Sequence, residues 1–319
     1  MNAAPGKISL VGIGPGSLDH LTPAARTAIL DADTVIGYAT YIKLIEPLLA
    51  GKEVIRKSMT EEIDRAIEAL ARAREGRKVA LISSGDAGVY GMAGPTYEVL
   101  FEAGWNPESA ESAESDIAVE VIPGASALNS CAALVGAPLT HDFCAISLSD
   151  LLTPWAVIAR RLNAAAEADF VVALYNPKSG RRSEQIVHAQ SLFLAHRDPA
   201  TPVAIVKSGY RARQKVELTT LAQLAEAEIG MLSTVLIGNS HTFVRAGLMV
   251  TPRGYTNKYD VGSGDTREGE QRGRSLSTGL DGFVATVRDS AEDASRLAER
   301  FGLPLTYIEQ LLAEPAAVT

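Results

Sequence analysis

Residues 78–94 read KVALISSGDAGVYGMAG and join two very different kinds of sequence. The first part, 78–83, is a short apolar run typical of a buried β-strand. The second part has one acid and a glycine at every third position: Asp86, Gly85, Gly88, Gly91 and Gly94. Four triplets are too few for a collagen helix, which needs sustained Gly-X-Y repetition. A main chain left so bare indicates that some other group approaches it closely.

Similar apolar runs recur along the chain and alternate with segments of helical periodicity. They cover residues 7–13, 33–37, 52–55, 117–123, 143–149, 169–175, 201–207 and 233–238. Continuous apolar strands alternating with helices indicate a largely parallel sheet covered on both faces. Because these runs are many for one doubly wound sheet, we expect an α/β fold of two domains with mainly parallel or mixed sheets.

The domain boundary is expected near VIPGASA, residues 121–127. We therefore predict an N-terminal α/β domain over 1–122 and a C-terminal α/β domain over 123–262. Residues 263–282 are rich in Gly, Ser and charged residues, which is typical of a flexible linker. Apolar spacing returns after it, so 283–319 is predicted to be a small helical appendage.

The composition limits the function classes. A formal net charge of −8 disfavours a general nucleic-acid binder. No apolar run reaches the roughly 18 residues of a membrane span, and the N-terminus lacks a secretory pattern. The two cysteines, Cys131 and Cys144, have neither metal-ligand spacing nor the pattern of a disulfide framework. These features predict a cytoplasmic protein that binds neither nucleic acid nor membrane.

VGIGPG, residues 11–16, ends the first apolar run without matching the dinucleotide fingerprint GxGxxG. Gly16 comes one position early, and Pro15 has no N–H to donate to a pyrophosphate. No GxxxxGK[ST] motif is present. Asp86 is better placed, because ligands of open α/β sheets bind just beyond the carboxyl ends of strands. It would accept hydrogen bonds from ribose hydroxyls, or serve as a turn or cap residue.

Several ordered motifs together resemble the tetrapyrrole methylases, the S-adenosylmethionine-dependent enzymes of cobalamin and sirohaem synthesis. The motifs are VGIGPG (11–16), SSGDAGVYGMAG (83–94), VIPGASA (121–127), HDFCAISLSDLLTPW (141–155), LYNPKSGRR (174–182) and TTLAQL with MLSTVLIGNS (219–240). Within the family, GYATY (37–41) and residues 141–155 are most similar to the ring-contracting branch, which methylates carbon 17. The resemblance covers about Lys7 to Phe243 and leaves the tail, 263–319, unmatched.

The resemblance implies two α/β domains with S-adenosylmethionine bound between them and no metal. The implied cofactor contacts, mostly through the main chain, are Pro15, Gly85, Asp86, Val89, Met92, Ala93, Ser126, Ala127, Leu174, Tyr175, Ala204, Ile205, Thr234 and Val235. On this interpretation the glycines are bare because the cofactor lies on them.

The implied substrate is a tetrapyrrole of the precorrin type, whose side chains end in carboxylates. An acidic protein needs local positive charge to bind it, and residues 178–215 are rich in Lys and Arg. Lys178 and Arg181 are the expected substrate contacts, with Tyr41 stacking on the macrocycle; solvated loops and core packing are the alternatives.

Methyl transfer from a sulfonium needs placement rather than a protein nucleophile. Ring contraction also needs a proton moved. His141 and Asp150 flank the run 143–149 and are the candidate proton carriers, although either would serve equally well as a turn or cap residue.

Other functions stay open. One is the same reaction on a cobalt-containing substrate, or methylation at another carbon. Another is a tetrapyrrole carrier without catalysis, which need not bind S-adenosylhomocysteine. We expect a homodimer, with the tail available for contact with neighbouring pathway enzymes.

Overall fold

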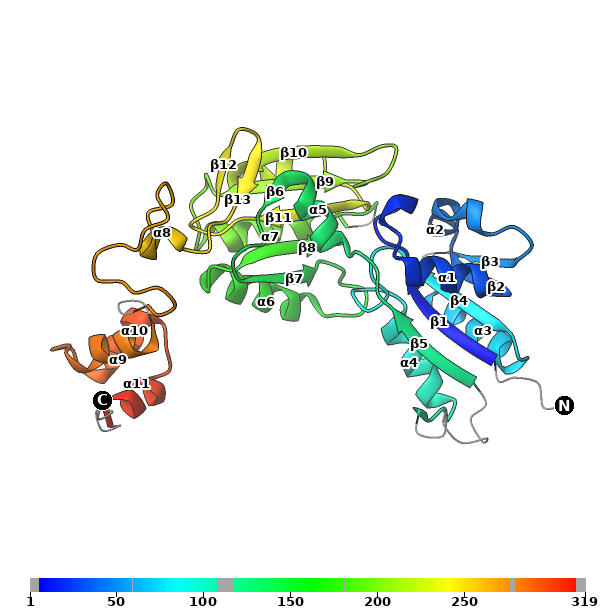
Figure 1. Ribbon diagram of the computed structural model, residues 1–319, viewed down its shortest axis with the longest axis horizontal. Coiled ribbons are helices and arrows are strands. Elements are labelled where there is room, and N and C mark those ends of the chain that lie inside the picture. Colours follow the sequence, from blue (N-terminus) through cyan, green and yellow to red (C-terminus); the bar gives the residue numbers. More distant parts are fainter. Residues whose placement is uncertain (1–5, 59, 108–116, 181, 276–278, 314–319) are drawn as a thin grey trace. The chain divides into compact units, whose positions relative to one another are not determined.

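The computed structural model describes residues 6–58, 60–107, 117–180, 182–275 and 279–313 (Figure 1). The chain forms two compact units, Met1–Thr251 and Pro252–Thr319. Within the described ranges, no helix has both the length and the apolar character needed to cross a membrane.

The first sheet of unit 1 is parallel throughout. Its strands are β1 (Gly6–Gly12), β2 (Thr34–Tyr38), β3 (Glu53–Lys57), β4 (Lys78–Ser83) and β5 (Ile117–Ile122). Their order is β3-β2-β4-β1-β5, with every neighbouring pair parallel. The central strands β1 and β4 are buried almost along their whole length, which explains their continuous apolar sequence.

Helices cover both faces of this sheet. They are α1 (Pro23–Asp31), α2 (Ala39–Leu44), α3 (Glu62–Arg74) and α4 (Ala93–Glu102), with short 3-10 helices at Leu18–His20 and Glu46–Leu48. One core contains Ile29 and Ile42 from α1 and α2, and a separate core contains Leu70 and Leu100 from α3 and α4. The predicted α/β arrangement is confirmed here.

The second sheet of unit 1 is mixed. Its strands are β7 (Phe143–Ser147), β8 (Val171–Tyr175), β9 (Pro202–Lys207), β10 (Lys215–Thr220) and β11 (Ser233–Ile237), in the order β10-β9-β11-β8-β7. Only β7 and β8 run parallel; β11 is antiparallel to both its neighbours, and β10 is antiparallel to β9. The sequence did not predict β10, whose residues are mostly half-buried and polar.

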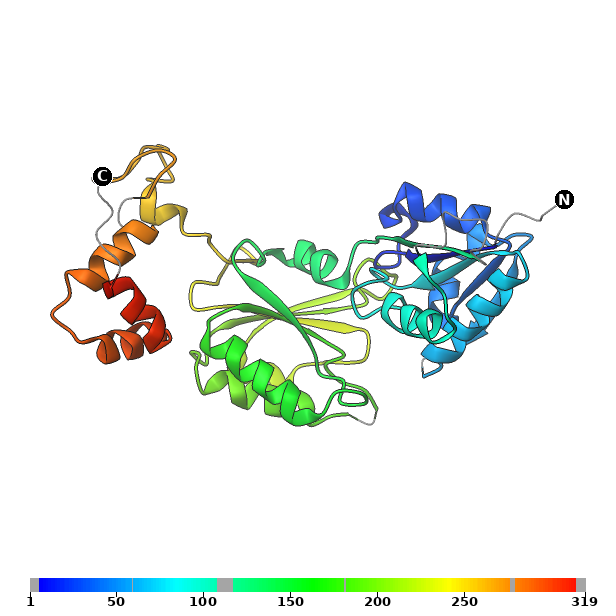
Figure 2. The same cartoon turned by 90° about the horizontal axis from the view of Figure 1, so that it is seen from below.

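Different elements cover the two faces of the second sheet. Helices α6 (Trp155–Glu167) and α7 (Gln185–Leu194) pack beside each other on one face, with a 3-10 helix at Leu221–Glu226 (Figure 2). The other face carries α5 (Ala127–Val135) and a small sheet of β6 (Gly136–Ala137), β12 (Phe243–Arg245) and β13 (Leu248–Val250). Helix α5 therefore begins at the pocket described below and ends in this small sheet.

Unit 2 has its own small helical core. Its helices are α8 (Tyr255–Lys258), α9 (Leu280–Arg288), α10 (Ala294–Phe301) and α11 (Leu305–Ala313). Val287, Leu297 and Ile308 are completely buried among these helices. Two β-bridges involve the expected linker: Thr266 pairs with Tyr259, which precedes the linker, and Gln271 pairs with Arg274 within it. The boundary of the compact unit lies at Thr251–Pro252, and the finer division of the chain stays a prediction.

Candidate active site

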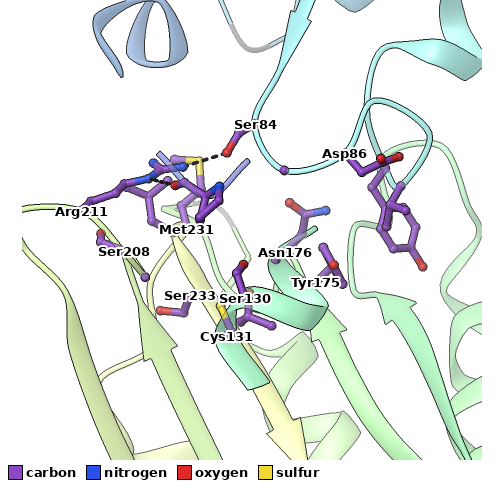
Figure 3. A pocket seen from close by; sticks show the side chains of 18 of the residues that line it. Ser84, Asp86, Ser130, Cys131, Tyr175, Asn176, Ser208, Arg211, Met231 and Ser233 are labelled. Atoms are coloured by element: carbon purple, nitrogen blue, oxygen red, sulfur yellow. Dashed lines mark hydrogen bonds between the residues drawn. The ribbon is translucent and has the colours of Figure 1, made fainter. Parts of the chain in front are cut away.

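A pocket in unit 1 collects residues from the carboxyl ends of β1 and β4, from α5 and from the loops of the second sheet (Figure 3). Its lining consists of Pro15, Tyr41, Ser84, Gly85, Asp86, Val89, Tyr90, Ala127, Ser130, Cys131, Tyr175, Asn176, Ser208, Gly209, Arg211, Met231, Leu232, Ser233 and Thr234. Hydroxyl, amide and apolar groups alternate around it. It is the position at which an open α/β sheet is expected to bind a ligand.

The glycine loops on the first side of the pocket pack against one another. Gly14 and Gly85 exchange two main-chain hydrogen bonds, with N–O distances of 3.0 and 2.8 Å. A Cβ atom on Gly124 would lie 2.3 Å from the carbonyl oxygen of Gly85 and 2.6 Å from that of Gly12. Three loops, after β1, β4 and β5, thus meet backbone to backbone. The close approach predicted from the sequence is made, at these glycines, by the protein's own main chain.

Asp86 braces the same loops. One carboxylate oxygen accepts a hydrogen bond from the Gly88 N–H at 2.8 Å, and the other accepts one from the Gly124 N–H at 2.9 Å. The first bond closes a local turn, and the second joins the loop after β4 to the loop after β5. Asp86 therefore acts as a turn residue that also lines the pocket, and its contact with a ribose stays a prediction.

Side chains dominate the second side of the pocket. Tyr175, at the end of β8, accepts a hydrogen bond from the Leu128 N–H at 2.8 Å and so positions the start of α5. The Tyr90 ring lies 4.9 Å from the Tyr175 ring between centroids, and its hydroxyl donates to the Ala145 carbonyl at 3.1 Å. Burial raises the pKa of the Tyr175 phenol and that of the Cys131 thiol, so both groups are neutral near pH 7.

Three lining residues other than glycine have left-handed backbones: Tyr90 at φ 51°, Asn176 at φ 49° and Ser208 at φ 51°. Such conformations are uncommon outside glycine and gather at ligand sites, where the surrounding structure holds them in place. The Asn176 side chain contributes to this by donating to the Ser147 hydroxyl at 3.0 Å. Of these three residues only Asn176 carries a partial signal in the sequence, because asparagine adopts left-handed backbones more readily than tyrosine or serine.

The cofactor contacts implied by the resemblance fall into two groups. Those that line the pocket are Pro15, Gly85, Asp86, Val89, Ala127, Tyr175 and Thr234. Those outside the lining are Met92, Ala93, Ser126, Leu174, Ala204, Ile205 and Val235. Most of the second group have side chains buried in the sheet cores, whereas Ser126 caps α5 by accepting from the Asn129 N–H. Main-chain contacts from this second group stay predictions.

The expected proton carriers lie outside the pocket lining. His141 uses its Nδ1 atom to accept from the Asp142 N–H at 2.8 Å. Asp150 is exposed and accepts from the Gln185 side-chain amide at 2.8 Å. Their local bonds match the alternative of turn and surface residues, so a role in proton transfer stays a hypothesis.

The expected substrate contacts are divided as well. Tyr41 lines the pocket, and burial raises the pKa of its phenol. Lys178 is half-buried and does not line the pocket. Arg181 lies outside the described residues.

The sequence missed Arg211 as an individual site residue. It belongs to the loop between β9 and β10, yet its Nε donates to the Pro15 carbonyl at 2.7 Å and its Nη2 donates to the Ser84 hydroxyl at 2.8 Å. A Cβ atom on Gly16 would lie 2.8 Å from the Arg211 Nε, so the early glycine of VGIGPG leaves room for this side chain. No local pattern indicates a partner almost two hundred positions away.

Comparison with known proteins assigns the class. The family model described as tetrapyrrole (corrin/porphyrin) methylases matches residues 7–225, which is well over half of the chain. The chain belongs to this family, as its motifs indicated. Tetrapyrrole methylases take their methyl group from S-adenosylmethionine.

Two similar relatives are both named as cobalt-factor III methyltransferases. The chain is 57% identical over 256 residues to a cobalt-factor III methyltransferase of Priestia megaterium, covering 80% of this chain and 46% of that protein. The chain thus spans about half the length of this relative. It is 46% identical over 249 residues to a probable cobalt-factor III C(17)-methyltransferase of Salmonella typhimurium, covering 78% of this chain and 99% of that protein.

A similar solved structure is also that of a methyltransferase. The crystal structure of the methyltransferase CobJ superposes with a TM-score of 0.70 at 35% identity, covering 77% of this chain and 100% of that one. The two-sheet architecture of unit 1 is therefore that of a tetrapyrrole methyltransferase.

Proposed function

We propose that the chain transfers a methyl group from S-adenosylmethionine to carbon 17 of precorrin-3B, with ring contraction to precorrin-4, in cobalamin biosynthesis. The observation that carries this proposal is the 46% identity over 99% of the Salmonella typhimurium protein, whose name specifies carbon 17. The 35% identity over the whole of CobJ supports the same reaction class.

The pocket has the chemistry that S-adenosylmethionine needs. Apolar side chains such as Pro15, Val89 and Met231 suit the adenine and thioether parts, and the hydroxyls of Ser84, Ser130 and Ser233 suit the polar ends. When bound, the cofactor supplies an electrophilic methyl group. The protein's contribution is then placement of two large ligands, which is worth roughly 7–11 kcal/mol for well-oriented pairs.

The metal state of the substrate gives a second candidate. Identity is 57% and 46% to the two cobalt-factor III proteins, against 42% over 241 residues to the protein CobIJ of Mycobacterium bovis. This order of identities supports cobalt-factor III as the second candidate substrate. The cobalt would arrive inside the macrocycle as part of the substrate. In the part of the chain that the structure describes, no group of three or more His, Cys, Asp or Glu is placed to hold a metal ion.

Reaction products test both candidates. The purified chain is incubated with S-adenosylmethionine and either precorrin-3B or cobalt-factor III, and the tetrapyrrole is analysed by mass and absorption spectrum. The expected product gains one methyl group and shows the spectrum of a contracted ring with at least one substrate. A chain that binds tetrapyrrole but neither binds S-adenosylhomocysteine by calorimetry nor methylates would be a carrier instead.

The remaining expectations are proposals with simple tests. We propose a homodimer in the cytoplasm. Light scattering of the purified protein checks the oligomeric state, and cell fractionation checks the location.

We also propose that unit 2 is dispensable for catalysis, because its helices bury a core of their own, and that it serves contact with other pathway enzymes. Removal of residues 255–319 should leave S-adenosylhomocysteine affinity unchanged; loss of the folded state on truncation would contradict this.

A further inference from the structure

Two arginines of unit 1 are held in very different ways: the Arg197 side chain is buried, and the Arg211 side chain is half-buried. The Arg197 side chain is only 2% exposed and lies 3.9 Å from the Asp169 carboxylate. It donates to the carbonyl oxygens of Gly238 at 2.6 Å, Phe170 at 2.6 Å and Ala165 at 2.9 Å. These carbonyl acceptors and the neighbouring carboxylate satisfy the hydrogen-bond donors and the charge of the buried Arg197 guanidinium within the protein itself.

Arg211 has fewer protein partners than Arg197. Its two hydrogen bonds go to neutral acceptors, the Pro15 carbonyl and the Ser84 hydroxyl. Among the residues that the structure describes, no carboxylate forms an ion pair with it, and no hydrogen bond of its Nη1 appears. The Arg211 side chain is half-buried, and burial lowers its pKa, as burial also lowers the pKa of Arg197 beside Asp169.

The position of Arg211 indicates that an anion paired with it would lie in the pocket. Arg211 lines the pocket, and Figure 3 shows its side chain extended beside Met231 toward Ser84. The two bonds hold the guanidinium plane from one edge, and Gly16 provides the space beneath it. A guanidinium fixed in this way is preorganised for a carboxylate, because its fork of donors matches the two oxygens of that group.

We propose that Arg211 is the carboxylate-binding residue of this pocket, held in place by Pro15 and Ser84 and completed by an anionic group of a ligand. The proposal rests on the proposed function for the identity of the ligands. Two sources offer the same chemistry: the carboxylate at the methionine end of the methyl donor, and a peripheral carboxylate of the tetrapyrrole. Either would supply the negative charge that the protein lacks at this point.

The test compares two nucleosides, only one of which carries a carboxylate, and a tetrapyrrole that carries several carboxylates. Binding of S-adenosylhomocysteine and of 5′-methylthioadenosine, which lacks the amino-acid end, is measured by calorimetry; binding of uroporphyrin, a polycarboxylate, is measured by absorbance titration. The variants are Arg211→Met and Arg211→Gln, with Arg211→Lys as the conservative change that keeps the charge. Arg213→Met, at an exposed position of the same loop, is the matched control for general loss of positive charge.

If the cofactor supplies the carboxylate, both neutral variants should bind S-adenosylhomocysteine about tenfold or more weakly and methylthioadenosine normally. If the tetrapyrrole supplies it, uroporphyrin binding should weaken by a similar factor and both nucleosides should bind normally. In either case Arg211→Lys should recover part of the affinity, and Arg213→Met should behave as the wild type.

Two outcomes overturn the proposal. One is affinity within about threefold of the wild type for both S-adenosylhomocysteine and uroporphyrin in folded neutral variants. The other is an equal loss for S-adenosylhomocysteine and methylthioadenosine, which would mean that Arg211 only shapes the pocket. None of these measurements needs turnover, so failure of the proposed function would appear separately, as a wild-type chain that binds these ligands and yields no methylated product.

Discussion

The two sides of the pocket are built by different means. On the first side, three loops after parallel strands lock together through main-chain atoms at Gly12, Gly85 and Gly124, with Asp86 as a brace. On the second side, the mixed sheet supplies side chains such as Tyr175, Asn176 and Arg211. The comparison shows that the first side is a frame with no space for added atoms at Gly12 and Gly124, whereas the second side supplies most of the side chains of the pocket and should tolerate conservative substitutions.

The largest effect is expected where the frame has no free space. Gly124→Val would place its Cβ 2.3 Å from the Gly85 carbonyl oxygen, which is a main-chain atom and cannot turn away as the end of a flexible side chain would. We expect a loss of about 3 kcal/mol or more in the free energy of unfolding, together with loss of S-adenosylhomocysteine binding. Denaturant unfolding and calorimetry measure the two quantities.

Gly94→Ala is the matched control for Gly124→Val. No atom lies within 4 Å of a Cβ at Gly94, which is in helix α4, so stability should stay level or rise by up to about 1 kcal/mol. A Gly124→Val protein as stable as Gly94→Ala would show that the first side of the pocket has room for a side chain at Gly124.

A large kinetic effect is expected for the proton carrier of ring contraction. A general acid or base typically contributes about 10²–10⁴-fold. His141→Gln and Asp150→Asn each remove one candidate, and one of them should accumulate a methylated, uncontracted tetrapyrrole while binding S-adenosylhomocysteine normally. Product mass and absorption spectrum identify it. Full product at normal rates from both variants would assign the proton to another group.

Asp86 should show an intermediate effect, because it serves the frame and the pocket together. Asp86→Ala leaves the partly buried Gly124 N–H without its acceptor, which costs about 1 kcal/mol of stability. We also expect S-adenosylhomocysteine to bind about tenfold or more weakly as the two loops separate.

Ser17→Ala provides the comparison for Asp86→Ala. Ser17 caps the short helix Leu18–His20, follows the loop after β1 and does not line the pocket. It should change affinity little. Unchanged affinity in a folded Asp86→Ala protein would remove Asp86 from the site.

The smallest effect is a pH dependence shared by the two sides. Burial raises the pKa of Tyr41 and of Tyr175 above the ordinary value of 10.0. The folded state therefore holds these protons more tightly than the unfolded state. The two neutral phenols contribute fully to the free energy of unfolding below about pH 10, and this contribution is lost as the pH rises through the pKa values of the folded state. Thermal unfolding between pH 8 and 11 should show a flatter alkaline decline for Tyr41→Phe and for Tyr175→Phe than for the wild type. An identical decline in all three proteins would show that neither phenol is coupled to folding.

Local sequence patterns predicted one sheet better than the other. The central strands β1 and β4 of the first sheet are apolar and buried along most of their length, because both faces are covered. Helices join the successive strands, so their parallel direction follows from the pattern. Strand β10 was missed because KVELTT lies at the edge of its sheet and is mostly half-buried. The antiparallel course of β11 was missed because strand direction depends on where the connecting segments cross, which no local periodicity records.

The same limit applies to the site. Pro15, Gly85, Asp86, Tyr175 and Thr234 were identified because they belong to contiguous motifs, and all of them line the pocket. The sequence could not show that the glycines face other glycines, since Gly12, Gly85 and Gly124 come from three separate loops.

By itself the sequence determined the α/β class, the motifs of a tetrapyrrole methylase and most of the loops that form the pocket. These properties are written in runs of neighbouring residues, where strand periodicity and glycine spacing act over a few positions. Only the tertiary structure decided that Asp86 holds Gly124 and that Arg211 crosses Gly16 to reach Pro15 and Ser84. These contacts join residues far apart in the chain, and their energy depends on burial and on the full set of partners, which exist only after folding.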